Sequence, residues 1–397
     1  MKTLLRSFLL LGLIQICFAL SGFAQRHSQK YRLFVGTYTA MDGKDTGSKG
    51  IYSYQFDEIS GKLTPSGVAA ETVNPSFLVV APNKKFVYAV NELQKYKGEA
   101  SGGVTAFSLD PKTGKLRELD EVASRGADPC YISFDRTGKY VLVANYTGGT
   151  VAVFPVSSDG HIRDASSVEN DKGTLGPNKE RQEHAHAHWI ETSARNRFAY
   201  VSDLGLDRVL IYKFDAAKGL LSSEATGPSD TSFFSATLAP GTGPRHIAFS
   251  KNGDFMYVLG EMGSTVTVFA NDSKETFRSI QNISALPPGF SGKNDAAEIA
   301  IHPSGKFLYT SNRGDDSIAV FAIDRATGKL TFVQRISTEG KAPRHFAIDP
   351  AGTHLLAANQ DSGNVVEFKI DAATGKLTSQ GEVAKVPAPV CLIFVAE

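Results

Sequence analysis

The stretch 129-PCYISFDRTGKYVLVANYTGGTVAVFPVSSDGHI-162 determines the fold, because its pattern returns along the whole chain. Each copy contains four short runs: one after a proline, one ending in an Asn-like residue, one such as TVAVF, and one after a turn such as ATGKL. The first three runs are rich in Val, Ile, Phe and Tyr, and Gly or Asp-Gly turns separate them, which is typical of β-strands joined by tight turns. Complete copies occupy 75–116, 129–162, 187–221, 244–277, 296–330 and 343–377.

A seventh copy is split between the two ends of the chain. The segments 33-LFVGTY-38 and 51-IYSYQFDEISGKL-63 match the later runs, and 389-PVCLIFV-395 matches the first run. A split unit lets the chain ends close a ring and removes open sheet edges. We therefore predict an all-β, seven-bladed β-propeller of four-stranded antiparallel blades, in which N- and C-terminal strands share one blade. An open β-solenoid is the alternative, but it does not require the split unit.

The composition excludes two other classes of protein. The chain has 397 residues, of which 42% are hydrophobic, so it can bury a large core and is not disordered over its bulk. Its 42 basic and 41 acidic residues give a net charge of +1, whereas nucleic-acid binders carry a marked basic excess. We expect no nucleic-acid partner, and nothing in the sequence indicates the oligomeric state.

The N-terminus is typical of an export signal. Lys2 and Arg6 precede an apolar run from Phe8 to Leu20, and 22-GFA-24 offers small residues at the −3 and −1 positions of a cleavage site. We predict a signal peptide over 1–24 and a single propeller domain over 25–397, periplasmic or secreted and free of the membrane after cleavage. A retained signal anchor is the alternative; a lipoprotein through Cys17 is disfavoured because bulky Ile16 precedes it.

Alignment of the repeats on their turn glycine identifies two rings of residues. The turn position holds Gly138, Gly253, Gly305 and Gly352, with Lys84 and Asn196 substituting. The innermost strands begin with Ser76, Cys130, His188, Arg245, Ala297, Arg344 and Val390. The next strands end with Thr37, Glu92, Tyr146, Leu204, Glu261, Arg313 and Gln360. Adjacent strands of a blade are antiparallel, so both rings should line the same mouth of the channel.

Three consecutive blades carry residues at the ring positions that differ from those of the other blades and that are typical of a catalytic or binding site. They contribute His188, then Arg245 with Glu261, then Arg313. A structural propeller can repeat similar residues in every blade, whereas this set places an acid–base pair between guanidinium groups. Such a set in a concavity is typical of a small-molecule site.

The sequence resembles the seven-bladed lactonase family, which includes the propeller type of 6-phosphogluconolactonase and the fungal carboxymuconate lactonizing enzyme. The resemblance runs from about Tyr31 to the C-terminus. It rests on 36-GTYT-39, 177-PNKERQEHAHAH-188, 203-DLGLDRV-209, 241-GTGPRHIAF-249 and 311-SNRGDDSIAVF-321. The family's proposed site residues fall on His188, Arg245, Glu261 and Arg313, which we take as the candidate catalytic residues. One departure is Gly260, where the family usually has Asn before the Glu.

Four further residues are candidate substrate-binding groups. They are Arg344, Glu92, His186 and Arg181, of which Arg181 lies in the long segment 163–187 before an innermost strand. If extended, 184-HAHAH-188 would place its three imidazoles on one face and suggest a metal. The neighbouring repeats show no second set of ligands and the resemblance implies no metal, so we expect neither a metal nor another cofactor. His246 and His345 follow ring positions and should point into the blade packing.

Opening a lactone requires a water made nucleophilic and stabilisation of the resulting oxyanion. Glu261 or His188 could accept the water proton, and Arg245 or Arg313 could stabilise the oxyanion or hold an anionic group. The sequence leaves the choice of base open. The resemblance implies lactone hydrolysis, with 6-phosphogluconolactone or a related aldonolactone as substrate; an export signal favours an unphosphorylated or other acidic lactone. The alternatives are a ligand-binding YVTN-like propeller without enzymatic activity and a carboxymuconate-type lactonizing cycloisomerase.

Overall fold

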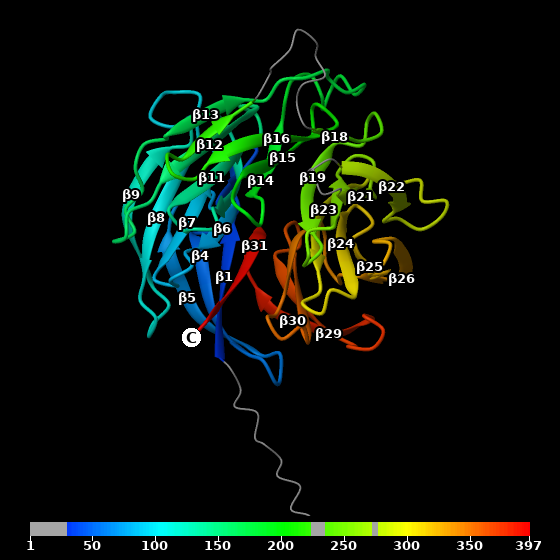
Figure 1. Cartoon of the computed structure of the whole chain (residues 1–397). Helices are drawn as coiled ribbons and strands as arrows, with labels where there is room; N and C mark the ends of the chain where they lie inside the picture. Colours follow the sequence, from blue (N-terminus) through cyan, green and yellow to red (C-terminus); the bar gives the residue numbers. More distant parts are fainter. Residues whose placement is uncertain (1–29, 224–234, 272–276) are drawn as a thin grey trace, which may run out of the picture.

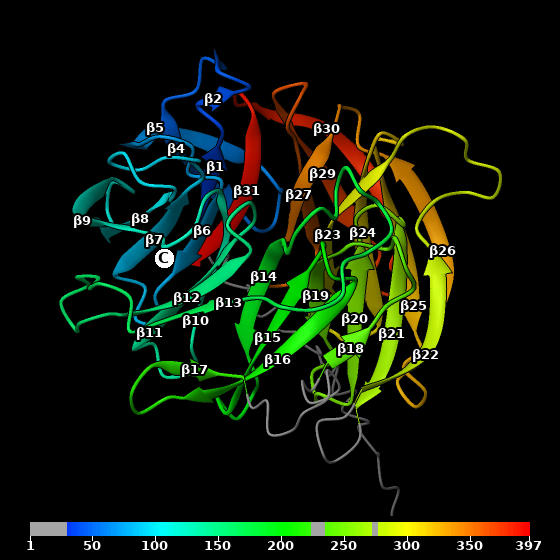
Figure 2. The ribbon, with the colours of Figure 1, turned by 90° about the horizontal axis from the view of Figure 1, so that it is seen from above.

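The computed structural model describes residues 30–223, 235–271 and 277–397, and these form seven antiparallel blades around a central channel (Figures 1 and 2). The predicted all-β propeller is confirmed. Six blades have four strands, and the fourth blade in chain order gains a fifth because β18 pairs with β16. The predicted signal peptide over 1–24 lies outside the described residues. Within the described ranges, no helix is long and apolar enough to cross a membrane.

The strands follow the chain in blade order. The split blade contains β31 (Pro389–Ala396), β1 (Lys30–Thr37), β4 (Gly50–Asp57) and β5 (Leu63–Glu71), and a small hairpin of β2 (Ala40–Met41) and β3 (Lys44–Asp45) lies between β1 and β4. The other blades are β6 (Phe77–Val80), β7 (Phe86–Asn91), β8 (Gly103–Leu109) and β9 (Leu116–Ala123); β10 (Pro129–Phe134), β11 (Tyr140–Asn145), β12 (Thr150–Pro155) and β13 (Ser167–Asn170); β14 (Ala187–Thr192), β15 (Phe198–Asp203), β16 (Arg208–Asp215), β17 (Leu220–Ser222) and β18 (Ser235–Thr237); β19 (Pro244–Phe249), β20 (Phe255–Gly260), β21 (Thr265–Asn271) and β22 (Phe277–Ser284); β23 (Asp295–Ile301), β24 (Phe307–Arg313), β25 (Ser317–Ile323) and β26 (Leu330–Ser337); and β27 (Pro343–Ile348), β28 (His354–Asn359), β29 (Asn364–Ile370) and β30 (Leu377–Lys385).

The ring is closed by the pairing of β31 with β1. The two strands run antiparallel from the Tyr31–Ala396 pair to the Thr37–Pro389 pair, and Figure 1 shows red β31 beside blue β1. On its other side β31 contacts β27 and β6, and every innermost strand contacts the next around the channel. The split seventh blade is therefore confirmed, and the open solenoid is excluded.

The tight turns have the backbone conformation that the alignment implies. The turn glycines have positive φ, for example 70° at Gly138 and 79° at Gly253, a region that glycine enters without steric cost. Lys84 and Asn196, the two substitutes, have φ of 59° and 56°. The same left-handed turn thus connects the first two strands of these blades.

A β-bulge interrupts most innermost strands at the ring position. In the ladders of the described strands, one residue of the inner strand is left without a cross-strand partner at Cys130, His188, Arg245, Arg344 and Val390. A bulge inserts an extra residue and re-aims side chains. The ring positions found by sequence alignment are therefore the bulged positions, and this irregularity turns them toward the channel.

The bulge also overturns one sequence expectation. His246 and His345 do not point into the blade packing but into the channel. Their rings lie 5.9 Å and 5.6 Å from the ring of Phe77 on β6, edge to face. Because β19 and β6 belong to blades that are not neighbours, His246 and Phe77 can meet only across the channel. Strict alternation after Arg245 and Arg344 fails because the bulge shifts the register.

The burial pattern predicts a sharp contrast between two Phe→Ala substitutions. Phe34 on β1 is fully buried among side chains that include Leu78 of β6 and Cys391 of β31, whereas Phe332 on β26 is 53% exposed. We expect F34A to lower the free energy of unfolding by about 3–5 kcal/mol through the cavity it leaves. F332A should change it by about 0.5 kcal/mol or less. Guanidinium unfolding measures both, and equal losses would contradict the proposed closure packing around β1.

Candidate functional site

A cavity of about 450 Å³ opens at one mouth of the channel. Eight of its lining residues come from the two predicted rings, namely Cys130, His188, Arg344, Glu92, Tyr146, Glu261, Arg313 and Gln360. The prediction that both rings line one mouth is thus confirmed for these positions. Six ring positions are not among the lining residues: Ser76, Arg245, Ala297, Val390, Thr37 and Leu204. The Thr37 hydroxyl instead bonds Ser48 Oγ at 2.6 Å and Gly50 O at 2.7 Å, and Leu204 is fully buried.

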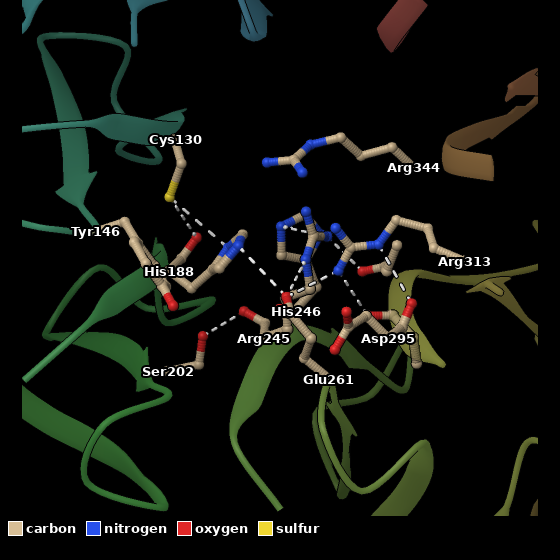
Figure 3. Close-up of polar contacts among 12 residues, drawn as sticks. Cys130, Tyr146, His188, Ser202, Arg245, His246, Glu261, Asp295, Arg313 and Arg344 are labelled. Carbon is tan, nitrogen blue, oxygen red and sulfur yellow. Dashed lines mark hydrogen bonds and ion pairs between the residues drawn. The ribbon is translucent and has the colours of Figure 1, made fainter. Parts of the chain in front are cut away.

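Glu261 is the centre of the site. It follows β20, is 4% exposed, and contacts the guanidinium groups of Arg181, Arg245 and Arg313; Figure 3 shows it beside Arg245 and Arg313. Its Oε1 accepts a hydrogen bond from Arg181 Nη2 at 2.5 Å. Its Oε2 lies 3.0 Å from both Arg245 Nε and Arg313 Nη2. Oε1 is therefore hydrogen-bonded, and Oε2 is in ion-pair contact with two guanidinium groups, although Arg245 Nε does not have hydrogen-bond geometry toward it.

The guanidinium groups decide the ionisation of Glu261. Burial alone would raise the pKa of this carboxyl, because a charged group loses hydration. The positive charges of Arg313, Arg245 and Arg181 outweigh burial and lower the pKa to about 2. Glu261 is therefore a carboxylate at any pH at which the protein is expected to work.

Arg245 also contacts a second polar cluster in the channel, which consists of His246, Glu298 and His345. Its Nη1 donates to Ala297 O, and the same nitrogen lies 3.3 Å from His246 Nε2. His246 Nδ1 lies 3.0 Å from Glu298 Oε2, and His345 Nε2 lies 3.4 Å from the same oxygen. Burial, followed by the charges of Arg313 and Arg344, lowers the pKa of Arg245 to about 10, so it remains charged at neutral pH.

His188 lies at the edge of the Glu261 cluster. It is 4% exposed, its Nε2 is 3.9 Å from Glu261 Oε2, and its Nδ1 is 3.7 Å from Cys130 Sγ. Burial and then the charges of Arg245 and neighbouring groups hold the pKa of His188 well below its ordinary value of 6.5. The imidazole is therefore neutral at pH 7. At 3.9 Å it does not form a hydrogen bond with Glu261.

Arg344 forms the opposite side of the cavity. Its guanidinium lies over the ring of Tyr38 at 5.2 Å, and its Nη2 is 4.0 Å from Glu92 Oε1. The Tyr38 hydroxyl donates to the same Glu92 oxygen at 2.8 Å. Within the part of the chain that the structure describes, Arg344 donates no hydrogen bond to protein. Its donors are thus available to an anionic or hydroxyl-bearing ligand.

The two candidates from the segment before β14 are placed differently. Arg181 reaches the cavity, where its Nη2 also donates to the Tyr146 hydroxyl at 3.3 Å and its Nη1 lies 3.6 Å from Asp295 Oδ1. His186 does not line the cavity. Its ring stacks on Tyr146 with centroids 4.4 Å apart, and its Nδ1 donates to Tyr146 O at 3.1 Å.

Several residues of the site escaped the sequence analysis. Tyr38 lies inside the quoted stretch 36-GTYT-39 but just after a ring position, and Asp295 lies just before the start of another blade's alignment. His246 and Glu298 were missed because the bulge displaces them into the channel. The sequence contained a signal for Tyr38, because this residue lies in the motif 36-GTYT-39. It contained no signal for the β-bulges that place His246 and Glu298 in the channel.

A seven-bladed propeller with a buried carboxylate among guanidinium groups and a neutral imidazole at its channel mouth belongs to the class of propellers with a small-molecule site. Comparison with known proteins narrows this class. Residues 32–394 match the family model described as "Lactonase, 7-bladed beta-propeller", and the chain belongs to that family.

Three relatives illustrate the likeness. The 6-phosphogluconolactonase of Bacillus subtilis is 37% identical over 318 residues, covering 80% of this chain and 84% of the relative. The 6-phosphogluconolactonase of Formosa agariphila is 34% identical over 321 residues, covering 79% and 85%. The structure of the periplasmic gluconolactonase PpgL of Pseudomonas aeruginosa superposes with a TM-score of 0.83 at 36% identity, covering 92% of this chain and 99% of that chain.

The buried imidazoles predict acid destabilisation. Burial first, with His246 and Arg245 adding to it, lowers the pKa of His345 to about 4, against an ordinary value of 6.5. Its stabilising contribution is therefore complete above pH 6.5 and is lost as the pH falls toward 4, because the unfolded chain binds the proton first. We expect H345Q to reduce the pH slope of the unfolding free energy by about 1.4 kcal/mol per pH unit in this window. Guanidinium unfolding from pH 7 to 4 tests this; an unchanged slope would contradict it.

Proposed function

We propose that the protein hydrolyses a sugar lactone to the corresponding acid. The observation that carries the proposal is the buried, ionised Glu261 held by three guanidinium groups next to neutral His188, at the edge of a cavity of about 450 Å³. Membership of the lactonase family and the names of its relatives support the reaction class.

The reaction adds water to the lactone carbonyl and breaks the ring C–O bond. The oxygen of water forms the new bond to the carbonyl carbon, its proton is taken by a base, and the ring oxygen leaves as a hydroxyl after receiving a proton. We assign stabilisation of the negative charge that develops on the carbonyl oxygen to Arg313, which lines the cavity, and to Arg245, which is buried behind Glu261. Donors aimed at that charge in a site that excludes water contribute strongly to catalysis.

His188 is the better candidate for the base. Both oxygens of Glu261 are in ion-pair contact with guanidinium groups, and a carboxylate with a pKa of about 2 has little affinity for a proton. His188 lines the cavity as a neutral imidazole. Cys130 Sγ lies beside its Nδ1, so a proton on Nδ1 would leave the Nε2 lone pair for water. Glu261 then acts by positioning the arginines.

Arg344 is the proposed substrate-orienting residue. Its uncommitted guanidinium lies across the cavity from Glu261, and Glu92 is held by the Tyr38 hydroxyl instead of by a close contact with Arg344. Burial raises the pKa of Glu92, and the positive charge of Arg344 opposes this. A carboxylate or phosphate of the substrate can accept two parallel hydrogen bonds from such a group.

We propose that the protein is exported and that its substrate is an unphosphorylated aldonolactone or another acidic lactone. The support is the signal-peptide pattern over 1–24, with the mature domain at 25–397, and the likeness to a gluconolactonase described as periplasmic. Sugar phosphates are intermediates of the cytosol, which favours a substrate without phosphate for an exported enzyme.

Activity is tested by following proton release from a panel of lactones. The panel contains gluconolactone, 6-phosphogluconolactone and a lactone bearing a carboxylate, with spontaneous hydrolysis subtracted. We expect H188Q to lower kcat by about 10²–10⁴-fold, and E261Q and R245A to lower it by about 10²-fold or more. H161Q and R125A, which change exposed residues paired with Asp120 and Asp164, serve as matched controls and should keep full activity.

Turnover that survives in H188Q, E261Q and R245A would overturn the site assignment but not the lactonase activity. No turnover on any lactone would favour a ligand-binding propeller instead. The pH profile separates the two bases: kcat/KM should fall only in acid well below pH 6.5, where His188 is protonated, and the residual activity of H188Q should lack this limb.

The role of Arg344 predicts a selective change in KM. We expect R344Q to raise KM about 10–100-fold for lactones that bear a phosphate or carboxylate, because one charge-assisted contact is lost. KM for uncharged gluconolactone should change by about threefold or less, and this ratio is insensitive to any loss of folded protein. Equal changes for charged and uncharged lactones would contradict the assignment.

A further inference from the structure

A second group of polar side chains lies next to the cavity but outside it. It consists of Glu183, His184 and His186, on the segment that leads into β14. Glu183 Oε1 is 3.3 Å from His184 Nε2 and 3.2 Å from His186 Nε2. All three donor atoms lie within 4.8 Å of one another.

The second nitrogen of each imidazole shows where its proton lies. His184 Nδ1 is 2.8 Å from Ala185 O, and His186 Nδ1 is 3.1 Å from Tyr146 O. A carbonyl oxygen only accepts, so both Nδ1 atoms must carry hydrogen. In neutral rings both Nε2 atoms then carry lone pairs, and both lie within 3.3 Å of Glu183 Oε1 at angles that form no hydrogen bond with it. Three acceptor atoms then lie close together, an arrangement that an added proton or a cation would complete.

His186 makes this conflict costly. Its side chain is 4% exposed, and its Nε2 is buried without a hydrogen bond. A buried acceptor without a donor is destabilising, because it has lost its bond to water. A cation at the point where the three atoms converge removes the conflict at once. The backbone carbonyls that hold the two Nδ1–H groups are the partners that orient metal-binding histidines in proteins.

The distances match a transition-metal site. A zinc ion bonded tetrahedrally at about 2.0–2.1 Å from each donor holds its donors about 3.3–3.4 Å apart. The two oxygen–nitrogen separations in the structure are 3.3 Å and 3.2 Å, which an ion pair can also adopt. Glu183 and His184 are 47% and 45% exposed, so an ion can enter from solvent and the His184 ring has room to adjust.

We infer that Glu183, His184 and His186 bind a divalent transition-metal ion, Zn²⁺ by preference. Two imidazoles and one carboxylate suit Zn²⁺, and a three-residue set leaves a fourth position for water or another ligand. The sequence expectation of no metal rested on the absence of a second ligand set in neighbouring repeats and on the family resemblance. The proposed site needs no such repeat, because all three ligands come from one short segment, with Glu183 supplying the oxygen. His188, the third imidazole of the motif, lies apart next to Glu261.

The ion would also fix the segment that carries Arg181. His186 stacks on Tyr146, and the Tyr146 hydroxyl accepts from Arg181, two residues before Glu183. A metal bound at 183–186 would therefore hold two parts of the surroundings of Arg181: the Tyr146 ring on which His186 stacks, and the backbone at Glu183 just after it. The inference itself does not depend on which reaction the site performs.

The test is metal binding by the purified protein, free of any polyhistidine tag and stripped with chelator. Zn²⁺ is titrated by calorimetry, and Co²⁺ is titrated as a spectroscopic probe, since tetrahedral Co²⁺ gives strong visible absorption. We expect the protein to bind one equivalent of either metal, and Zn²⁺ to displace bound Co²⁺ because both occupy the same site. In E183Q and H184N, which change exposed residues, affinity should fall about tenfold or more.

H161N is the matched control, because it removes an exposed imidazole whose Nδ1 lies 2.7 Å from Asp120 Oδ2 elsewhere on the surface. It should keep the full affinity. The inference is overturned if the native protein binds no metal at one equivalent, or if E183Q and H184N bind as tightly as H161N. A failure of lactone hydrolysis would leave these readouts unaffected, so the two proposals are tested separately.

Discussion

The antiparallel pairing of β31 with β1 is the interaction on which the rest of the structure depends. It joins residues near the two ends of the chain, such as Tyr31 and Ala396, and it converts a row of blades into a ring. Without it, β1 would lack its inner neighbour and expose a strand edge that invites aggregation. Closure also gives the inner strands one common axis. Only then do His188, Arg245 and Arg313, which come from three different blades, meet around a single carboxylate.

The chemistry of the site follows from a competition between burial and charge. Burial disfavours the ionised form of every group, and an unpaired buried charge costs several kcal/mol. Glu261 escapes this cost because three guanidinium groups surround it, whereas His188 has no carboxylate within hydrogen-bond distance and stays neutral. The cluster of Glu261 with its three arginines therefore carries net positive charge. This positive charge can stabilise an oxyanion. It also disfavours protonation of His188, so the neutral imidazole that can act as a base is retained.

The sequence predicts the ring and its site wherever the repeat is regular. Alignment of the repeats gives equivalent positions in every blade, and it identified four candidates in this way: His188, Arg245, Glu261 and Arg313. The structure brings all four together. His246 could not be identified in this way, since its position depends on where its inner strand departs from alternation, whereas Tyr38 lies in a motif that the sequence analysis quoted but next to the ring position that it aligned. The arrangement at Glu183 was equally hidden: its partners are set by backbone carbonyls of a turn, and hydrophobic periodicity carries no information about such contacts.

The bulges have a consequence for how such an enzyme can change. A bulged residue has no cross-strand partner, so its side chain can be exchanged without disturbing the hydrogen bonds that hold the blade. Cys130 and Val390 occupy the same kind of position as His188 and Arg245. The bulged positions of the inner strands can therefore carry different side chains on an unchanged backbone. New substrate preferences can evolve, or be engineered, by substituting one of these positions at a time while the propeller fold is retained.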